Sequence, residues 1–121
     1  MSSSRGADAL EAVHAFALGL PEAWEDHPWD GHPVAKVGKK IFVFFGSPEQ
    51  PSLSVKLPES AEAARTLACC EPTGYGLGRW GWVSVTLSAP DCPDVEVLLD
   101  WAEESYRAIA PKKLVKRLDR D

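Results

Sequence analysis

The stretch "WVSVTL" at residues 82–87 decides the fold, because its side chains alternate strictly between two kinds. Every second residue is aliphatic, and the residues between are aromatic or hydroxylic. A β-strand points successive side chains to opposite faces, so period-two alternation predicts a strand with one buried face. The aliphatic set is Val83, Val85 and Leu87; the other set is Trp82, Ser84 and Thr86.

Three further short apolar segments precede this strand: "VAKV" at 34–37, "KKIFVFFG" at 39–46 and "LSVKL" at 53–57. Glycines and prolines separate them as the turns of an antiparallel meander require. The alternation within 53–57 places Leu53, Val55 and Leu57 on the side of Val83. Ser54 and Lys56 then join Trp82 on the opposite face.

Helical patterns flank and interrupt these strands. Asp8 is a plausible N-cap for a first helix with apolar residues at helical spacing, which Gly19 and Pro21 end. The run "PESAEAARTLACC" at 58–70 predicts a second helix, a third runs from Asp94 as N-cap to Pro111, and "KKLVKRL" at 112–118 predicts a short last one. We therefore expect an α+β domain whose antiparallel sheet of four to six strands is covered on one face by the first and third helices.

Length and composition indicate one globular domain over residues 1–121, with 45% apolar and 26% charged residues. The longest aliphatic and aromatic run, Ile41 to Phe45, is far too short to cross a bilayer, and the N-terminus offers no signal peptide. The three cysteines match neither a disulfide framework nor a CxxC spacing, so buried thiols are expected. We expect a cytoplasmic monomer without membrane contact.

Charge alternates in sign along the chain, although the net charge is −5. Residues 1–35 hold six acids and one base, residues 36–56 one acid and four bases, residues 57–104 nine acids and two bases, and residues 105–121 two acids and six bases. The electric field of this net negative charge opposes the approach of a polyanion. Such a partner would have to use a local patch.

The acidic stretch "LPEAWEDHPWDGHP" at residues 20–33 raises the question of a metal site. It lacks the spacings of an EF-hand, HxH or HExxH site, and Pro28 and Pro33 each fix the chain beside a histidine. We interpret it as a segment that Trp24 and Trp29 anchor on the core while its acids stay solvated. No metal and no cofactor are expected, with a weak surface metal site as the alternative.

The sequence motifs that would indicate catalysis are no stronger than the evidence for a metal site. The glycines of "GYGLG" at 74–78 lead into a strand rather than a helix N-terminus, which predicts a flexible loop instead of a phosphate cradle. No GxSxG elbow is present, and His14 lies in a predicted helix, where a partly buried or surface role is expected. The chain is therefore expected not to be an enzyme.

Five segments together resemble one family. "LPEAWEDHPW", "AKVGKKIFVFF", "LSVKLPE", "GRWGWVSVTL" and "EESYRAIAPKKL" follow in this order over nearly the whole chain, and the combination is similar to the MmcQ/YjbR family of small bacterial proteins. The resemblance implies a CyaY-like (frataxin-like) fold and DNA binding. The chain departs from the family at "APKKL", where Pro111 and an extra residue interrupt what in relatives looks like an unbroken Ala-Lys-Leu end of the third helix.

Candidate binding residues follow from the sheet face and the cations. On the face away from the helices, Trp82 and Lys56, with Lys36, Phe42 or Phe44 and with Arg79 and Trp80 at the edge, could stack bases and pair phosphates. The same mixture suits a protein or small-molecule interface. If DNA is the partner, the expected phosphate contacts are Lys36, Lys39, Lys40, Lys56, Arg79, Lys112, Lys113, Lys116 and Arg117, and Trp80 or Trp82 adds stacking.

Overall fold

The computed structural model describes residues 4–29, 32–47, 49–73 and 81–120. These residues form one six-stranded antiparallel sheet in the order β1-β2-β3-β4-β6-β5. The strands are β1 (Ala23–Trp29), β2 (His32–Val37), β3 (Lys40–Ser47), β4 (Gln50–Lys56), β5 (Cys70–Pro72) and β6 (Trp82–Thr86). The helices are α1 (Ser4–Leu18), α2 (Ala61–Ala64), α3 (Val95–Ile109) and α4 (Lys112–Arg120).

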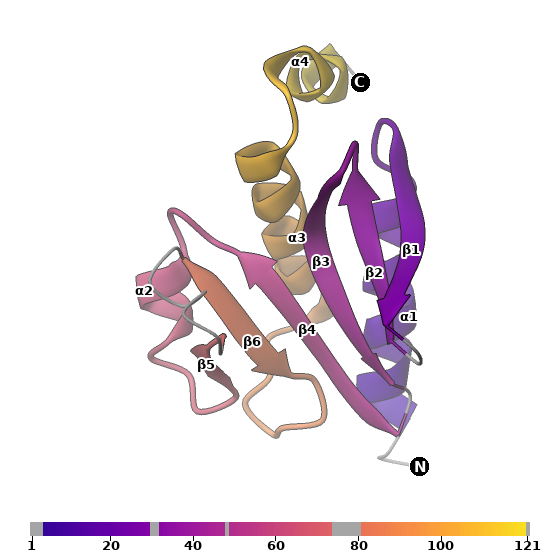
Figure 1. Cartoon of the computed structure of the whole chain (residues 1–121). Coiled ribbons are helices and arrows are strands. Elements are labelled where there is room, and N and C mark those ends of the chain that lie inside the picture. The colour runs from indigo at the N-terminus through magenta and orange to yellow at the C-terminus, as the bar shows by residue number, and fades with distance from the viewer. Residues whose placement is uncertain (1–3, 30–31, 48, 74–80, 121) are drawn as a thin grey trace.

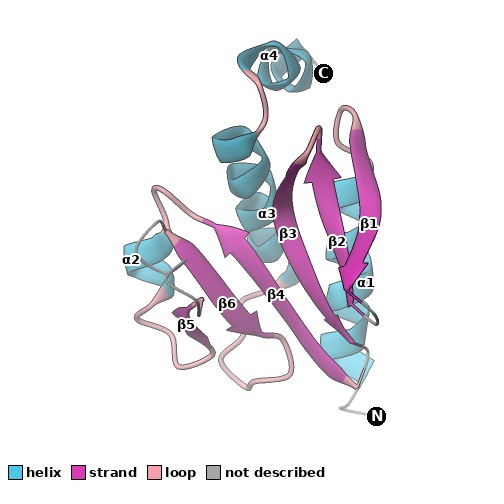
Figure 2. Cartoon of the chain, in the orientation of Figure 1, coloured by secondary structure: helices cyan, strands magenta, loops and turns pink. Residues whose placement is uncertain are grey.

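Two long helices lie side by side on one face of the sheet, as the sequence predicts (Figure 1). Both α1 and α3 pass behind the strands in this view, and α4 stands beyond the end of α3 (Figure 2). None of the described helices covers the face turned toward the viewer, which we call the open face. None of them is long and apolar enough to span a membrane. The α+β class is thus confirmed.

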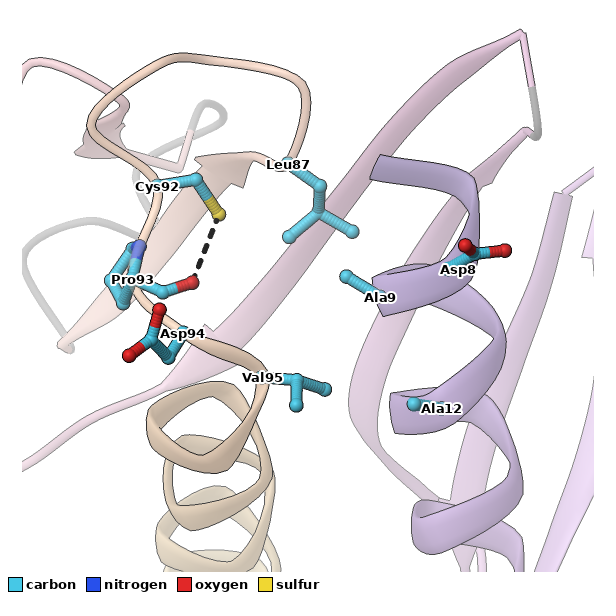
Figure 3. Close-up of a pocket in the computed structure, with 8 residues that line it drawn as sticks. All are labelled: Asp8, Ala9, Ala12, Leu87, Cys92, Pro93, Asp94 and Val95. Carbon is cyan, nitrogen blue, oxygen red and sulfur yellow. Dashed lines mark hydrogen bonds between the residues drawn. The ribbon is translucent and has the colours of Figure 1, made fainter. Parts of the chain in front are cut away.

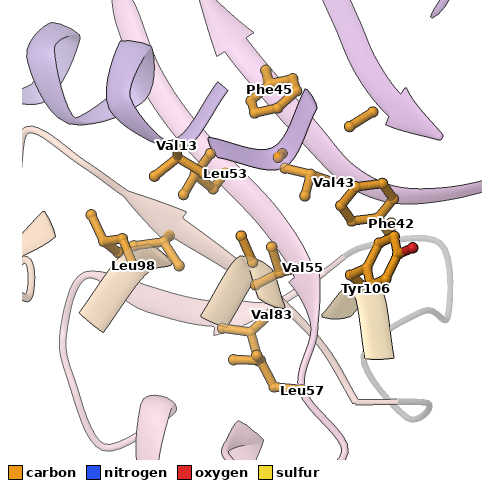
Figure 4. Close-up of a cluster of buried hydrophobic side chains, with 14 of the residues drawn as sticks. Val13, Phe42, Val43, Phe45, Leu53, Val55, Leu57, Val83, Leu98 and Tyr106 are labelled. Carbon is orange, nitrogen blue, oxygen red and sulfur yellow. The ribbon is translucent and has the colours of Figure 1, made fainter. Parts of the chain in front are cut away.

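The core fills the space between the sheet and these two helices (Figure 4). Val55, Val83 and Val85 point into it from adjacent strands, each at most 1% exposed. Leu98 and Tyr106 meet them from α3, which begins after Asp94 and ends before Pro111 as expected. The alternation of residues 82–87 therefore decides which face of the sheet is buried.

A β-bulge in β3 breaks the simple alternation. Val43 pairs with Ala35, but Ile41 pairs with Lys36, so β3 carries one residue more than β2 between these pairs. Phe42 and Val43 both become fully buried on the helix side, where the Phe42 ring meets that of Tyr106 edge-on at 5.3 Å. Phe44 then falls on the open face, so of the two candidate phenylalanines only Phe44 belongs to that face.

A serine of α3 closes the gap that the bulge leaves between β3 and β4. Their pairing runs to Val43 opposite Val55 and stops there. Beyond it, the hydroxyl of Ser105 donates to the carbonyl of Phe42 at 2.5 Å and accepts from the amide N–H of Lys56 at 2.9 Å. Ser105 is fully buried, so both backbone groups depend on this hydroxyl.

Two local predictions were wrong, and one further segment forms a strand that the sequence pattern had not assigned. Asp8 is not an N-cap but lies inside α1, which already begins at Ser4. The second helix is reduced to four residues, and Cys70 opens the short strand β5 because it pairs with Val85. The acidic stretch forms the edge strand β1, since it pairs with β2 from Ala23 onward.

Candidate nucleic-acid interface

Five exposed lysines gather at one end of the molecule, from segments more than 70 residues apart. We call this set the basic end: Lys39, Lys40, Lys112, Lys113 and Lys116. The turn between β2 and β3 and the helix α4 lie at the same end in Figure 1.

A hydrogen bond and two strand pairings link the two segments of the basic end. Arg117 of α4 donates to the Glu22 carboxylate at 3.0 Å. The next residue, Ala23, pairs with Val37, which in turn pairs with Lys40.

The β2–β3 turn presents its lysines because it is tight. Gly38 and Lys39 alone connect Val37 to Lys40. Gly38 has φ +63°, a conformation that two-residue hairpin turns require and that glycine adopts without strain. The indole N–H of Trp24 donates to the Gly38 carbonyl at 3.0 Å, which holds the turn against β1.

Helix α4 is positioned by a break in the chain and by an ion pair. Ala110 adopts an extended conformation, as a residue before proline prefers, and this ends α3. Leu114 is buried against the core. Arg107 of α3 donates to Asp119 of α4 at 2.6 Å and to Glu103 at 2.9 Å, and its hydrogen bond to Asp119 lowers the pKa of that carboxyl.

The cations at this end fall into two groups. Arg107 and Arg117 are engaged with carboxylates. Within the part of the chain that the structure describes, the five lysines of the basic end make no ion pair, although all are exposed. These amines are therefore available to an anionic ligand without breaking an internal contact.

Lys36 and Lys56 lie instead on the open face of the sheet. The Lys36 ammonium is 2.7 Å from an Asp26 oxygen and 5.3 Å from the centre of the Trp24 ring. The hydrogen bond from Lys36 lowers the pKa of Asp26. Lys36 is thus already paired, and Lys56 occupies the last position of β4, opposite Trp82.

Trp82 is less available than the sequence suggests. It lies on the open face, but only 8% of it is exposed, and its ring packs against that of Phe44 at 5.4 Å with an interplanar angle of 68°. Trp24, expected to anchor on the core, is 44% exposed. Arg79 and Trp80 lie outside the described residues, so their predicted roles stay predictions.

Two histidines contact the same carboxylate at the edge of the sheet. His27 contacts one oxygen of Glu25 at 2.9 Å, and His14 of α1 contacts the other at 2.6 Å. The edge of the His14 ring also packs against Phe45. This arrangement links α1 to β1; among the described residues, no group of histidines, cysteines and acids is arranged to hold a metal ion.

A cavity of about 440 Å³ opens between the start of α1 and the start of α3 (Figure 3). The floor of the cavity is apolar, with Leu87 and Val95 pointing inward. The Cys92 thiol donates a hydrogen bond to the Pro93 carbonyl. Asp8 and Asp94 point away from each other on opposite flanks. These carboxylates do not converge on one point, as a cation or a general acid–base pair would require.

Comparison with protein families gave one result. The model of the YjbR family matches residues 18–108, from the end of α1 almost to the end of α3. The match includes the β2–β3 turn with Lys39 and Lys40, whereas α4 lies beyond it. No curated protein matched the chain.

Proposed function

Because the chain belongs to the YjbR family and gathers at one end five exposed lysines that form no ion pair with any described residue, we propose that it is a DNA-binding protein. The basic end is the proposed contact surface. The role is binding rather than catalysis, and neither a metal nor a cofactor enters it.

The observation that carries this proposal is the gathering of Lys39 and Lys40 with the lysines of α4. Phosphate contacts supply most of the affinity of a sequence-independent DNA-binding protein, because each one releases condensed counterions. Two patches of two and three amines, joined through Arg117, Glu22 and the β1–β2–β3 ladder, offer several such contacts at once.

The acidic composition is compatible with this role. Exposed acids at the start of α1 and of α3, such as Asp8 and Asp94, lie at the opposite end of the molecule (Figure 1). A polyanion is repelled there and attracted at the basic end, so the field orients the approaching protein. The net charge of −5 then keeps binding weak and strongly dependent on salt.

The test is an anisotropy titration with labelled duplex and single-stranded DNA. If all five lysines contact phosphates, the log–log slope on duplex DNA is about 4.5, which corresponds to a roughly 500-fold loss of affinity between about 50 and 200 mM salt. The double variant Lys39→Gln/Lys40→Gln should lower this slope by about 1.8. The double variant Lys112→Gln/Lys113→Gln should lower the slope by the same amount.

The control is Arg65→Gln, which removes an exposed cation at the C-cap of α2, away from the basic end. It should leave the slope unchanged. The proposal fails if neither form of DNA binds at about 50 mM salt, where screening is weak, or if Arg65→Gln and the lysine variants weaken binding equally.

A further inference from the structure

An exposed aromatic side chain lies beside the lysines of the basic end. Trp24, near the start of β1, is 44% exposed, more than any other large apolar side chain whose burial the structure describes. Its indole N–H donates to the carbonyl of Gly38 at 3.0 Å, and Lys39 and Lys40 follow Gly38 directly. The edge of the ring therefore touches the turn that presents two of the five lysines.

The indole ring is held from one side. Trp24 lies opposite Lys36 in the β1–β2 pair, and the Lys36 ammonium is 5.3 Å from the centre of the ring. A cation over one face of an indole is attracted by the electrons of the ring, and Asp26 fixes this ammonium at 2.7 Å. Because nearly half of the residue is nevertheless exposed, the opposite face of the ring is left for a flat ligand.

The contacts that join the two lysine groups of the basic end pass directly beside Trp24. Glu22, two residues before it in the chain, accepts a hydrogen bond from Arg117 of α4 at 3.0 Å. Gly38 of the β2–β3 turn accepts one from the indole itself. A nucleic-acid strand whose phosphates reach both α4 and the turn can therefore place one of its bases on this ring.

The carboxylates close to Trp24 are paired with cations or lie on the other face of the strand. The carboxyl of Asp26 is paired with Lys36, and that of Glu22 is paired with an arginine of α4. Glu25 points to the helix side of β1, because successive side chains of a strand point to opposite faces, and it contacts a histidine of α1 there. The repulsion of a phosphate by these acids is therefore small beside the ring.

Resting on the DNA-binding role proposed above, we propose that Trp24 stacks on one unpaired base, so that the ligand of the basic end is single-stranded DNA. In a duplex, both faces of each base are already stacked, so a base must leave the duplex to lie on an indole ring. Every base has a flat face, so stacking tolerates any sequence. Sequence preference is therefore weak.

The experiment compares two single strands of equal length, about 8–12 nucleotides, within the range that single-strand-binding domains cover. One is an oligothymidylate, and the other has the same phosphates but an abasic sugar at every position. The native protein should bind the oligothymidylate about 5- to 150-fold more tightly, the range for stacking of one base. Trp24→Leu should bring this ratio near one without changing the affinity for the abasic strand.

A matched variant separates stacking from the positioning of the turn. Trp24→Phe keeps a flat ring but lacks the N–H that bonds to Gly38, so it should retain most of the ratio. Both variants lose the same hydrogen bond, which is exposed, so water can replace it and both should fold. Val97→Ala removes an exposed aliphatic side chain near the start of α3, at the other end of the molecule, and should leave the ratio unchanged.

The salt dependence distinguishes the ring from the lysines. Stacking releases no counterions, so Trp24→Leu should leave the log–log slope on the oligothymidylate unchanged. The double variant Lys39→Gln/Lys40→Gln removes two phosphate contacts and should lower this slope by about 1.4 on a single strand.

The outcomes separate the two proposals. If the native protein binds both strands equally, or if Trp24→Leu keeps the native ratio, the stacking proposal is wrong while the basic end still binds DNA. If Trp24→Phe loses the ratio as fully as Trp24→Leu, the side chain acts by holding the turn, and the stacking proposal is again wrong. If Lys39→Gln/Lys40→Gln weakens both strands equally, the DNA-binding proposal is supported independently of the ring. If neither strand binds, both proposals fail.

Discussion

Ser105→Ala should be among the most destabilising single-atom changes in this protein, although it removes only a buried hydroxyl. The variant leaves the Phe42 carbonyl and the Lys56 amide N–H without partners, because the β3–β4 ladder has already ended at Val43 and Val55. Water cannot replace the hydroxyl at a site with 0% exposure. Each unsatisfied buried group costs about 1–3 kcal/mol.

Allowing for partial relaxation of the strands, we expect a loss of roughly 2–4 kcal/mol in the free energy of unfolding. For a chain of this length that lowers the melting temperature by roughly 6–20 °C. Urea denaturation followed by tryptophan fluorescence measures the first quantity, and a thermal melt followed by circular dichroism measures the second.

The control is Ser84→Ala, which removes a half-buried hydroxyl that hydrogen-bonds to the hydroxyls of Ser54 and Thr73. Because water can reach these partly exposed partners, the loss should stay below about 1 kcal/mol. If Ser105→Ala costs no more than this control, the hydroxyl does not bridge the two strands as described, and the account of the bulge is wrong.

Three further predictions concern the core, a thiol and the surface. Val85→Asp should prevent folding, because it places an unpaired carboxylate at a position 1% exposed; a cooperative thermal melt of this variant would contradict the proposed core. Burial raises the pKa of the Cys70 thiol to about 12 from an ordinary 9.0, so the folded protein keeps this proton where the unfolded chain loses it. The free energy of unfolding should therefore fall as the pH rises above about 9, and Cys70→Ala should make this fall shallower; an unchanged slope would contradict the assignment. His27→Ala should cost less than about 1 kcal/mol in urea denaturation, since its contact with Glu25 is exposed, and a larger loss would show that the contact is structural.

The short-range sequence pattern was sufficient to identify an element and its buried face wherever one periodicity ran without interruption. The alternation of residues 82–87 identified β6 and its buried face, and the spacing of Leu98, Ala102 and Tyr106 identified the buried side of α3. Gly38 indicated the turn between β2 and β3, and "KKLVKRL" indicated a short cationic helix after Pro111. Each of these features depends on side chains within about one turn of one another, and the sequence displays such neighbours directly.

Strand pairing and packing between distant segments decided the features that the sequence pattern did not predict. The bulge that buries Phe42 and turns Phe44 to the open face depends on how β3 pairs with β2, and β5 exists only because β6 offers it an edge. The burial of Trp82 depends on Phe44, a residue 38 positions away in the sequence. The basic end likewise arises because α3 carries α4 back toward the β2–β3 turn. The sequence determined which residues are cationic, aromatic or apolar, whereas contacts between distant segments determined which of them meet, because those contacts depend on register and packing rather than on local periodicity.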